Sequence, residues 1–99
     1  MTQIERIARM EQYLDEANAS VAELTAALNQ YLAVQDKIHA LTSYYDDGTW
    51  REDYEADEAG RLPDGLKRGV LSQDALYDLL SENRELLLRV SEITKGVRT

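Results

Sequence analysis

Carboxylates crowd one short stretch near the middle of the chain. Seven acidic residues fall between positions 46 and 58, namely Asp46, Asp47, Glu52, Asp53, Glu55, Asp57 and Glu58. Clustered carboxylate oxygens are the ligands that hard cations such as Mg²⁺ and Ca²⁺ prefer. Residues 53–64 resemble a calcium-binding loop in their spacing, but Glu58 stands where that loop needs a glycine. A solvated acidic helix face is therefore the simpler interpretation, and no cofactor is expected.

The weak metal candidates are Glu52, Asp53, Glu55, Asp57 and Glu58. Two pairs of glutamates three residues apart suggest another chemistry: Glu52 with Glu55, and Glu82 with Glu85. Residues three apart share a helix face, so each pair could hold an ion as in all-helical nucleotide pyrophosphohydrolases. A small Mg²⁺- or Mn²⁺-dependent nucleotide hydrolase is one alternative function, although such pairs are common on exposed helices.

Composition excludes several classes of protein. The chain has 99 residues, one histidine, no cysteine and a net charge of -8, which excludes a disulfide scaffold, a thiolate metal site and a cysteine nucleophile. Direct nucleic-acid binding is not expected, because it needs a basic surface. An acidic decoy that occupies a nucleic-acid-binding protein is a further alternative. No residue is assigned as catalytic.

An apolar pattern of seven-residue period runs through the first half of the chain. One series is Ile7, Leu14, Val21 and Leu28, and a second series, three residues on, is Met10, Ala17, Leu24 and Tyr31. This is the seam of a helix that packs along another helix. A similar apolar pattern recurs near the C-terminal end, at Leu76, Leu79, Leu86, Val90 and Ile93. We expect a helix over about residues 3–45 and another over about 73–95, with a break near Asn18 as the alternative.

These patterns predict an all-α fold with a single helical domain over residues 1–99. The long N-terminal helix is expected to pack antiparallel against the shorter C-terminal helix. An acidic, aromatic connecting segment, residues 46–72, lies between them and contains a short helix. The C-terminal helix is too short to cover the whole seam, so a stripe at the N-terminal end lacks a partner. We expect a homodimer to complete the helical bundle through Ile4, Ile7, Met10 and Leu14.

Capping signals locate the expected helix ends. Thr2 with Glu5, and Thr49 with Glu52, have the spacing of capping boxes. Ser72 is a candidate N-cap for the last helix, and Gly60 a candidate stop for the short helix. Residues 62–65, Leu-Pro-Asp-Gly, predict a turn.

Aromatic and basic residues gather around the connecting segment. Aromatic side chains bring large contact areas and dominate binding hot spots, but they also cap cores. Lys67 and Arg68 form the one basic pair outside the expected helices, and pairing with the nearby carboxylates is the simpler interpretation. The candidate partner-binding residues are Tyr44, Tyr45, Trp50, Tyr54, Lys67 and Arg68.

The connecting segment and the residues on either side of it also carry a resemblance. It rests on Tyr44-Tyr45, Trp50, the run DYEADEAG over 53–60, Leu62-Pro63, the run LKRGVLS over 66–72, Asp74 and the run YDLL over 77–80. In these residues the chain resembles a family of small bacterial proteins catalogued only as a domain of unknown function. The resemblance implies a small bacterial all-helical protein, and it transfers no catalytic residue.

The leading hypothesis is a non-catalytic protein–protein interaction module, with regulation as one role open to it, that has an unidentified protein partner besides its own second copy. The longest apolar run, Tyr31–Val34, is far shorter than a membrane span, and the first residues lack the pattern of a signal peptide. We therefore expect a cytoplasmic protein that does not enter a membrane.

Overall fold

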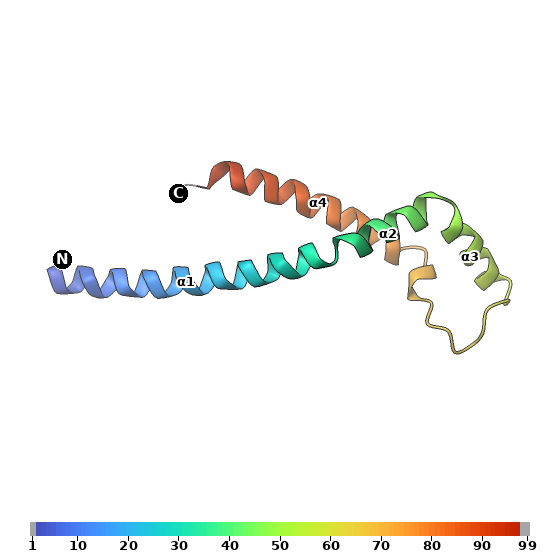
Figure 1. Ribbon diagram of the computed structural model, residues 1–99, viewed down its shortest axis with the longest axis horizontal. Coiled ribbons are helices and arrows are strands. Elements are labelled where there is room, and N and C mark those ends of the chain that lie inside the picture. Colours follow the sequence, from blue (N-terminus) through green and yellow to red (C-terminus); the bar gives the residue numbers. More distant parts are fainter. Residues whose placement is uncertain (1, 98–99) are drawn as a thin grey trace. The chain divides into compact units, whose positions relative to one another are not determined.

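The computed structural model describes residues 2–97, which form helices joined by turns, with no strand among them. The all-α fold class is therefore confirmed (Figure 1). These residues divide into two compact units, the first ending at Asp36 and the second beginning at Lys37. The packing of the first helix against the last, and one domain over residues 1–99, stay predictions.

Helix α1, Gln3–Ala33, is the longest element of the described chain. Thr2 caps it as predicted, because its Oγ1 accepts a hydrogen bond from the Glu5 backbone N–H at 3.1 Å. The 31 residues of α1 contain no glycine or proline, so the helix runs unbroken through Asn18 for about 46 Å. No residue of α1 is buried.

The helix expected over residues 3–45 is interrupted at Val34, and this part of the prediction is wrong. Helix α2 covers Gln35–Asp46. The Val34 N–H donates a hydrogen bond to the Tyr31 carbonyl at 3.3 Å. The Gln35 side-chain amide donates to the same carbonyl at 3.0 Å. The Gln35 side chain thus takes an acceptor that a continuous helix offers to a backbone N–H.

Helix α3 covers Thr49–Glu58 and has a different cap from the one predicted. Thr49 lies inside the helix, and the Asp47 carboxylate accepts its N–H at 2.9 Å. The Thr49–Glu52 capping box is therefore wrong. Asp47 provides the cap because Gly48, at φ 91°, turns the chain between them. Hydrogen bonds from the side chain and then the backbone of Thr49 lower the pKa of Asp47.

Gly60 ends α3 as predicted. It has a φ of 71°, which an L-residue adopts only with strain. The Gly60 N–H donates to the Asp57 carbonyl at 3.0 Å, and the Arg61 N–H donates to the Ala56 carbonyl at 2.9 Å. These two bonds form a complete Schellman motif, so the carbonyls of Ala56 and Asp57 in the last turn of α3 are satisfied within the chain.

The chain then turns back towards the last helix (Figure 1). A turn is present one residue later than predicted, over residues 63–66, since the Leu66 N–H donates to the Pro63 carbonyl at 3.2 Å. A single 3-10 turn, η1, covers Gly69–Leu71, and α4 covers Ala75–Gly96. Helix α4 begins two residues later than expected, yet Ser72 still acts as a cap because its hydroxyl accepts the Ala75 N–H at 3.2 Å.

The buried core of the described residues is small and belongs to the second unit. Leu71 in η1 and Leu76 in the first turn of α4 are 6% and 3% exposed. They bring η1 against α4, while α3 contacts η1 from another side. Among residues 2–97, no helix is both long enough and apolar enough to cross a bilayer.

Candidate functional site

The acidic residues of the connecting segment lie mostly along α3, and two of those on α3 are engaged within the chain. The Tyr44 hydroxyl donates to Asp53 Oδ2 at 2.6 Å, and Arg68 Nη1 donates to Asp57 Oδ1 at 2.5 Å. Residues 53–58 are helical, so they cannot form the loop that a calcium ligand set of this spacing requires. The helical backbone is thus a second reason against a calcium-binding loop, besides Glu58 at the glycine position.

The remaining metal candidates, Glu52, Glu55 and Glu58, are exposed on the surface of α3. Within residues 2–97, no group of three or more histidine or carboxylate side chains lies close enough together to hold a metal ion. Asp53 and Asp57 instead act as hydrogen-bond acceptors that join α3 to α2 and to the following turn. Burial, together with the hydrogen bond to Asp53 and its charge, raises the pKa of Tyr44 to about 12.

Three aromatic rings pack in sequence at the junction of α2 and α3. The ring centres of Tyr45 and Trp50 are 5.4 Å apart, and those of Trp50 and Tyr54 are 5.1 Å apart with planes only 20° from parallel. Trp50 Nε1 donates to the Val70 carbonyl at 2.9 Å, and the Gln73 amide donates to the Tyr54 hydroxyl at 2.9 Å. The stacked rings and the hydrogen bonds of their polar atoms therefore hold α3 against η1 and the residues before α4.

Arg68 stabilises the turn that follows α3. Besides its ion pair with Asp57, its guanidinium donates to the carbonyls of Pro63, Asp64 and Leu66 at 3.1, 3.3 and 3.4 Å. A planar guanidinium can serve several acceptors at once, which a lysine ammonium cannot match in the same geometry. The predicted pairing of this basic residue with the acidic segment is confirmed for Arg68, whereas Lys67 is exposed.

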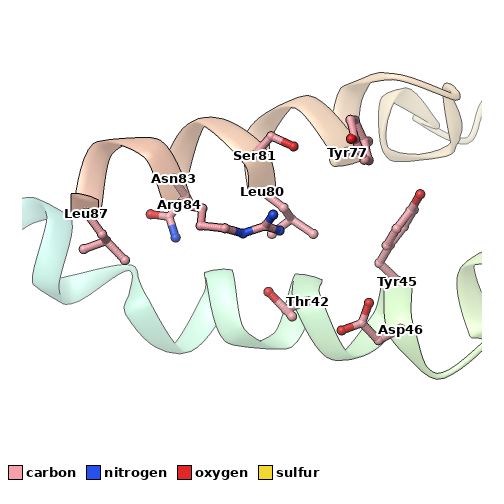
Figure 2. Close-up of a pocket in the computed structure, with 9 residues that line it drawn as sticks. All are labelled: Thr42, Tyr45, Asp46, Tyr77, Leu80, Ser81, Asn83, Arg84 and Leu87. Carbon is pink, nitrogen blue, oxygen red and sulfur yellow. The ribbon is translucent and has the colours of Figure 1, made fainter. Parts of the chain in front are cut away.

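A groove of about 260 Å³ lies between α2 and α4 in the second unit (Figure 2). Thr42, Tyr45 and Asp46 line it from α2. Its α4 side is formed by Tyr77, Leu80, Ser81, Asn83, Arg84 and Leu87. Figure 2 shows the Arg84 side chain extending from α4 towards α2. The groove combines apolar walls with two opposite charges, but it is smaller than the usual site for a drug-sized ligand.

The apolar seam of α1 is exposed from Ile7 to Leu28, whereas Tyr31 at its end is half-buried. Its exposed fractions are 52% at Ile7, 50% at Met10, 53% at Leu14, 65% at Val21, 67% at Leu24 and 49% at Leu28. Ile4, the fourth residue predicted for self-association, is 81% exposed. The structure thus presents all four predicted self-association residues on one accessible helix, while self-association through them stays a prediction.

The family model described as a domain of unknown function (DUF4298) matches residues 7–93. The chain belongs to this family. The resemblance to a family catalogued only as a domain of unknown function is therefore confirmed, and DUF4298 covers the α1 seam from Ile7 onward as well as the connecting segment. No curated protein and no solved structure matches the chain.

In this DUF4298 chain, the structure brings most of the residues predicted for partner binding into one network. Tyr44 reaches Asp53, Tyr45 packs on Trp50, Trp50 packs on Tyr54, and Arg68 pairs with Asp57. Lys67 lies outside these contacts. These contacts give the aromatic residues and Arg68 a structural role. Binding of a partner through them stays a prediction.

Sequence reasoning missed the groove between α2 and α4. Its lining joins residues about forty positions apart, which no local spacing can reveal. One signal was available, since Asn83 interrupts the apolar series between Leu76 and Val90, and a polar residue within a seam often marks a special contact.

Proposed function

We propose that this member of DUF4298 is a non-catalytic protein-interaction module whose contact surface is the apolar seam of α1. One observation carries the proposal: a 31-residue helix has large apolar side chains at heptad spacing, and none of its residues is buried. Exposed apolar stripes of this kind mark interaction surfaces in folded proteins.

The physical argument concerns how such a helix is stabilised. Most helical stability in proteins comes from packing of an amphipathic face and not from intrinsic propensity. The apolar side chains of α1 gain little while they face water, because burial contributes about 25 cal/mol per Å² of apolar surface. A second helix laid along the seam would supply that burial, so the partner surface we expect is itself an apolar helix face.

The other hypotheses have weaker support. The hydrolase hypothesis needs carboxylates grouped around an ion, and among residues 2–97 no three histidine or carboxylate side chains lie close enough together to hold one. The decoy hypothesis rests on charge alone. A bacterial origin and a cytoplasmic location stay predictions.

Site-specific photo-cross-linking in cells tests the proposed function. A photoreactive residue placed at Leu14 lies on the seam, and one placed at Asp15 lies on the neighbouring polar face. We expect a discrete cross-linked protein product from position 14 and none from position 15. The product can be a second copy or a different protein, and either supports the module. Equal yields, or no product at both positions, would refute the proposed function.

A further inference from the structure

The residues at the heptad positions of α1 indicate which partner helix packs on its seam. With Ile7 as position a, the a residues are Ile7, Leu14, Val21 and Leu28, and the d residues are Met10, Ala17, Leu24 and Tyr31. We propose that a second copy of this chain occupies the seam, with the two α1 helices parallel and in register as a coiled coil. This inference rests on the proposed function, and it names the partner and the orientation.

The charges beside the seam support this orientation. Positions e and g flank the seam, and along α1 they carry only two charged residues, Arg6 at g and Glu11 at e. The other charged residues of α1 occupy outward positions, namely Glu5, Arg9, Asp15, Glu16 and Glu23. The only flanking charges are thus opposite in sign and five residues apart.

A parallel coiled coil makes use of that spacing. In such a dimer a g residue of one helix lies beside the e residue of the next heptad on its partner, five positions later, and these pairs set partner choice and orientation. Arg6 of each copy therefore meets Glu11 of the other, giving two symmetric attractive pairs. In an antiparallel dimer, e faces e and g faces g, so these two residues do not meet.

The third heptad has the residue types of a parallel two-stranded coiled coil. β-branched residues at position a combined with leucine at position d favour two parallel strands. Val21 and Leu24 form that combination, whereas the other d residues are Met10, Ala17 and Tyr31. The pattern continues for four heptads, which is long enough to indicate a coiled coil. The small Ala17 lets the two backbones approach each other near the middle.

Disulfide trapping distinguishes the orientations in the full-length chain. The protein has no cysteine, so each introduced cysteine acts alone. A parallel, in-register dimer brings the two Met10 positions together, and we expect the Met10→Cys variant to form a disulfide-linked dimer with itself. The outward Asp15→Cys variant is the matched control and should stay unlinked. Linkage only when the Met10→Cys and Leu28→Cys variants are mixed would indicate an antiparallel dimer and overturn the proposal.

Charge variants test the specific pairs by sedimentation equilibrium. Arg6→Glu turns both attractive pairs into repulsive ones, and we expect the dimer dissociation constant to rise about tenfold. Arg9→Glu makes the same charge change at an outward position and should leave that constant within about twofold. Glu11→Arg should weaken the dimer as Arg6→Glu does. An equimolar mixture of these two single variants should restore dimers, because each then meets the opposite charge.

Failure of this inference is separable from failure of the proposed function. A wild-type chain that stays monomeric across micromolar to millimolar concentration overturns self-association. If position 14 still cross-links to a different protein in cells, the interaction module stands and only the identity of its partner changes.

Discussion

The hydroxyl of Tyr44 and the carboxylate of Asp53 are 2.6 Å apart, and this hydrogen bond joins the end of α2 to the second turn of α3. Its acceptor is a carboxylate, so the bond is stronger than one between neutral groups. It holds the two helices across the Asp47–Gly48 turn. The same contact contributes to the raised pKa of Tyr44, which makes the pairing measurable in solution.

The first prediction concerns alkaline pH. The pKa of Tyr44 rises from 10.0 to about 12 on folding, so its stabilising contribution is complete below pH 10 and is lost as the pH rises through about 12. We expect Tyr44→Phe to lower the free energy of unfolding by about 1 kcal/mol at neutral pH. The difference from wild type should shrink as the pH rises above 10 and then reverse, because a tyrosinate beside the Asp53 carboxylate is a charge that phenylalanine lacks. Urea unfolding at stepped pH measures this, and a constant difference would contradict the assignment.

The second prediction concerns the turn held by Arg68. Lysine keeps the charge but cannot reach Asp57 and the carbonyls of Pro63 and Asp64 together. We therefore expect Arg68→Lys to lower the free energy of unfolding by about 1–2 kcal/mol and to speed amide hydrogen exchange over residues 61–70. The reverse exchange at the adjacent exposed position, Lys67→Arg, is the control. Equal effects of the two substitutions would show that Arg68 does not organise the turn.

The third prediction uses two glycines with different backbones. Gly60 has a φ of 71°, whereas Gly65 has no positive φ, and open space surrounds the position of a Cβ at both. Any cost of alanine is therefore a backbone cost. We expect Gly60→Ala to destabilise the protein by about 1 kcal/mol and Gly60→Asn by less. Gly65→Ala should be neutral or slightly stabilising. Thermal melts of the three variants check this, and a neutral Gly60→Ala would contradict the Schellman end of α3.

The helix ends that depend on nearby residues could be predicted from the sequence. Thr2 and Gly60 do what their types and positions indicate, because a cap involves only the adjoining turn. At Val34 the break depends on the Gln35 side chain competing for one carbonyl, without a glycine or proline to signal it. At α3, Asp47 and Thr49 are both good capping residues, and only the turn at Gly48 selects between them. The groove between α2 and α4 needs tertiary contacts, which local patterns do not contain.

The fourth prediction concerns the small core. Leu76 is 3% exposed, while Leu88, on the same helix, is 65% exposed. Truncating a buried leucine removes its burial energy and leaves a cavity. We expect Leu76→Ala to cost about 2–3 kcal/mol in the free energy of unfolding and Leu88→Ala less than about 0.5 kcal/mol. Chemical denaturation of both variants measures the contrast. A similar cost at the two positions would mean that η1 and α4 do not share a core.

The last prediction concerns divalent cations and uses Trp50, the only tryptophan, as the reporter. Trp50 stacks on Tyr54 in α3, next to the acidic residues, so an ion bound there would change its fluorescence. Binding through Asp53 and Asp57 would first have to displace Tyr44 and Arg68. We therefore expect Mg²⁺, Mn²⁺ and Ca²⁺, titrated at fixed ionic strength, to leave the fluorescence and the melting temperature unchanged.

A saturable change at micromolar metal with a higher melting temperature would contradict this, because a ligand that binds the folded state stabilises it. Loss of that change in Glu52→Gln would then assign the ion to the Glu52–Glu55 pair and favour the hydrolase hypothesis.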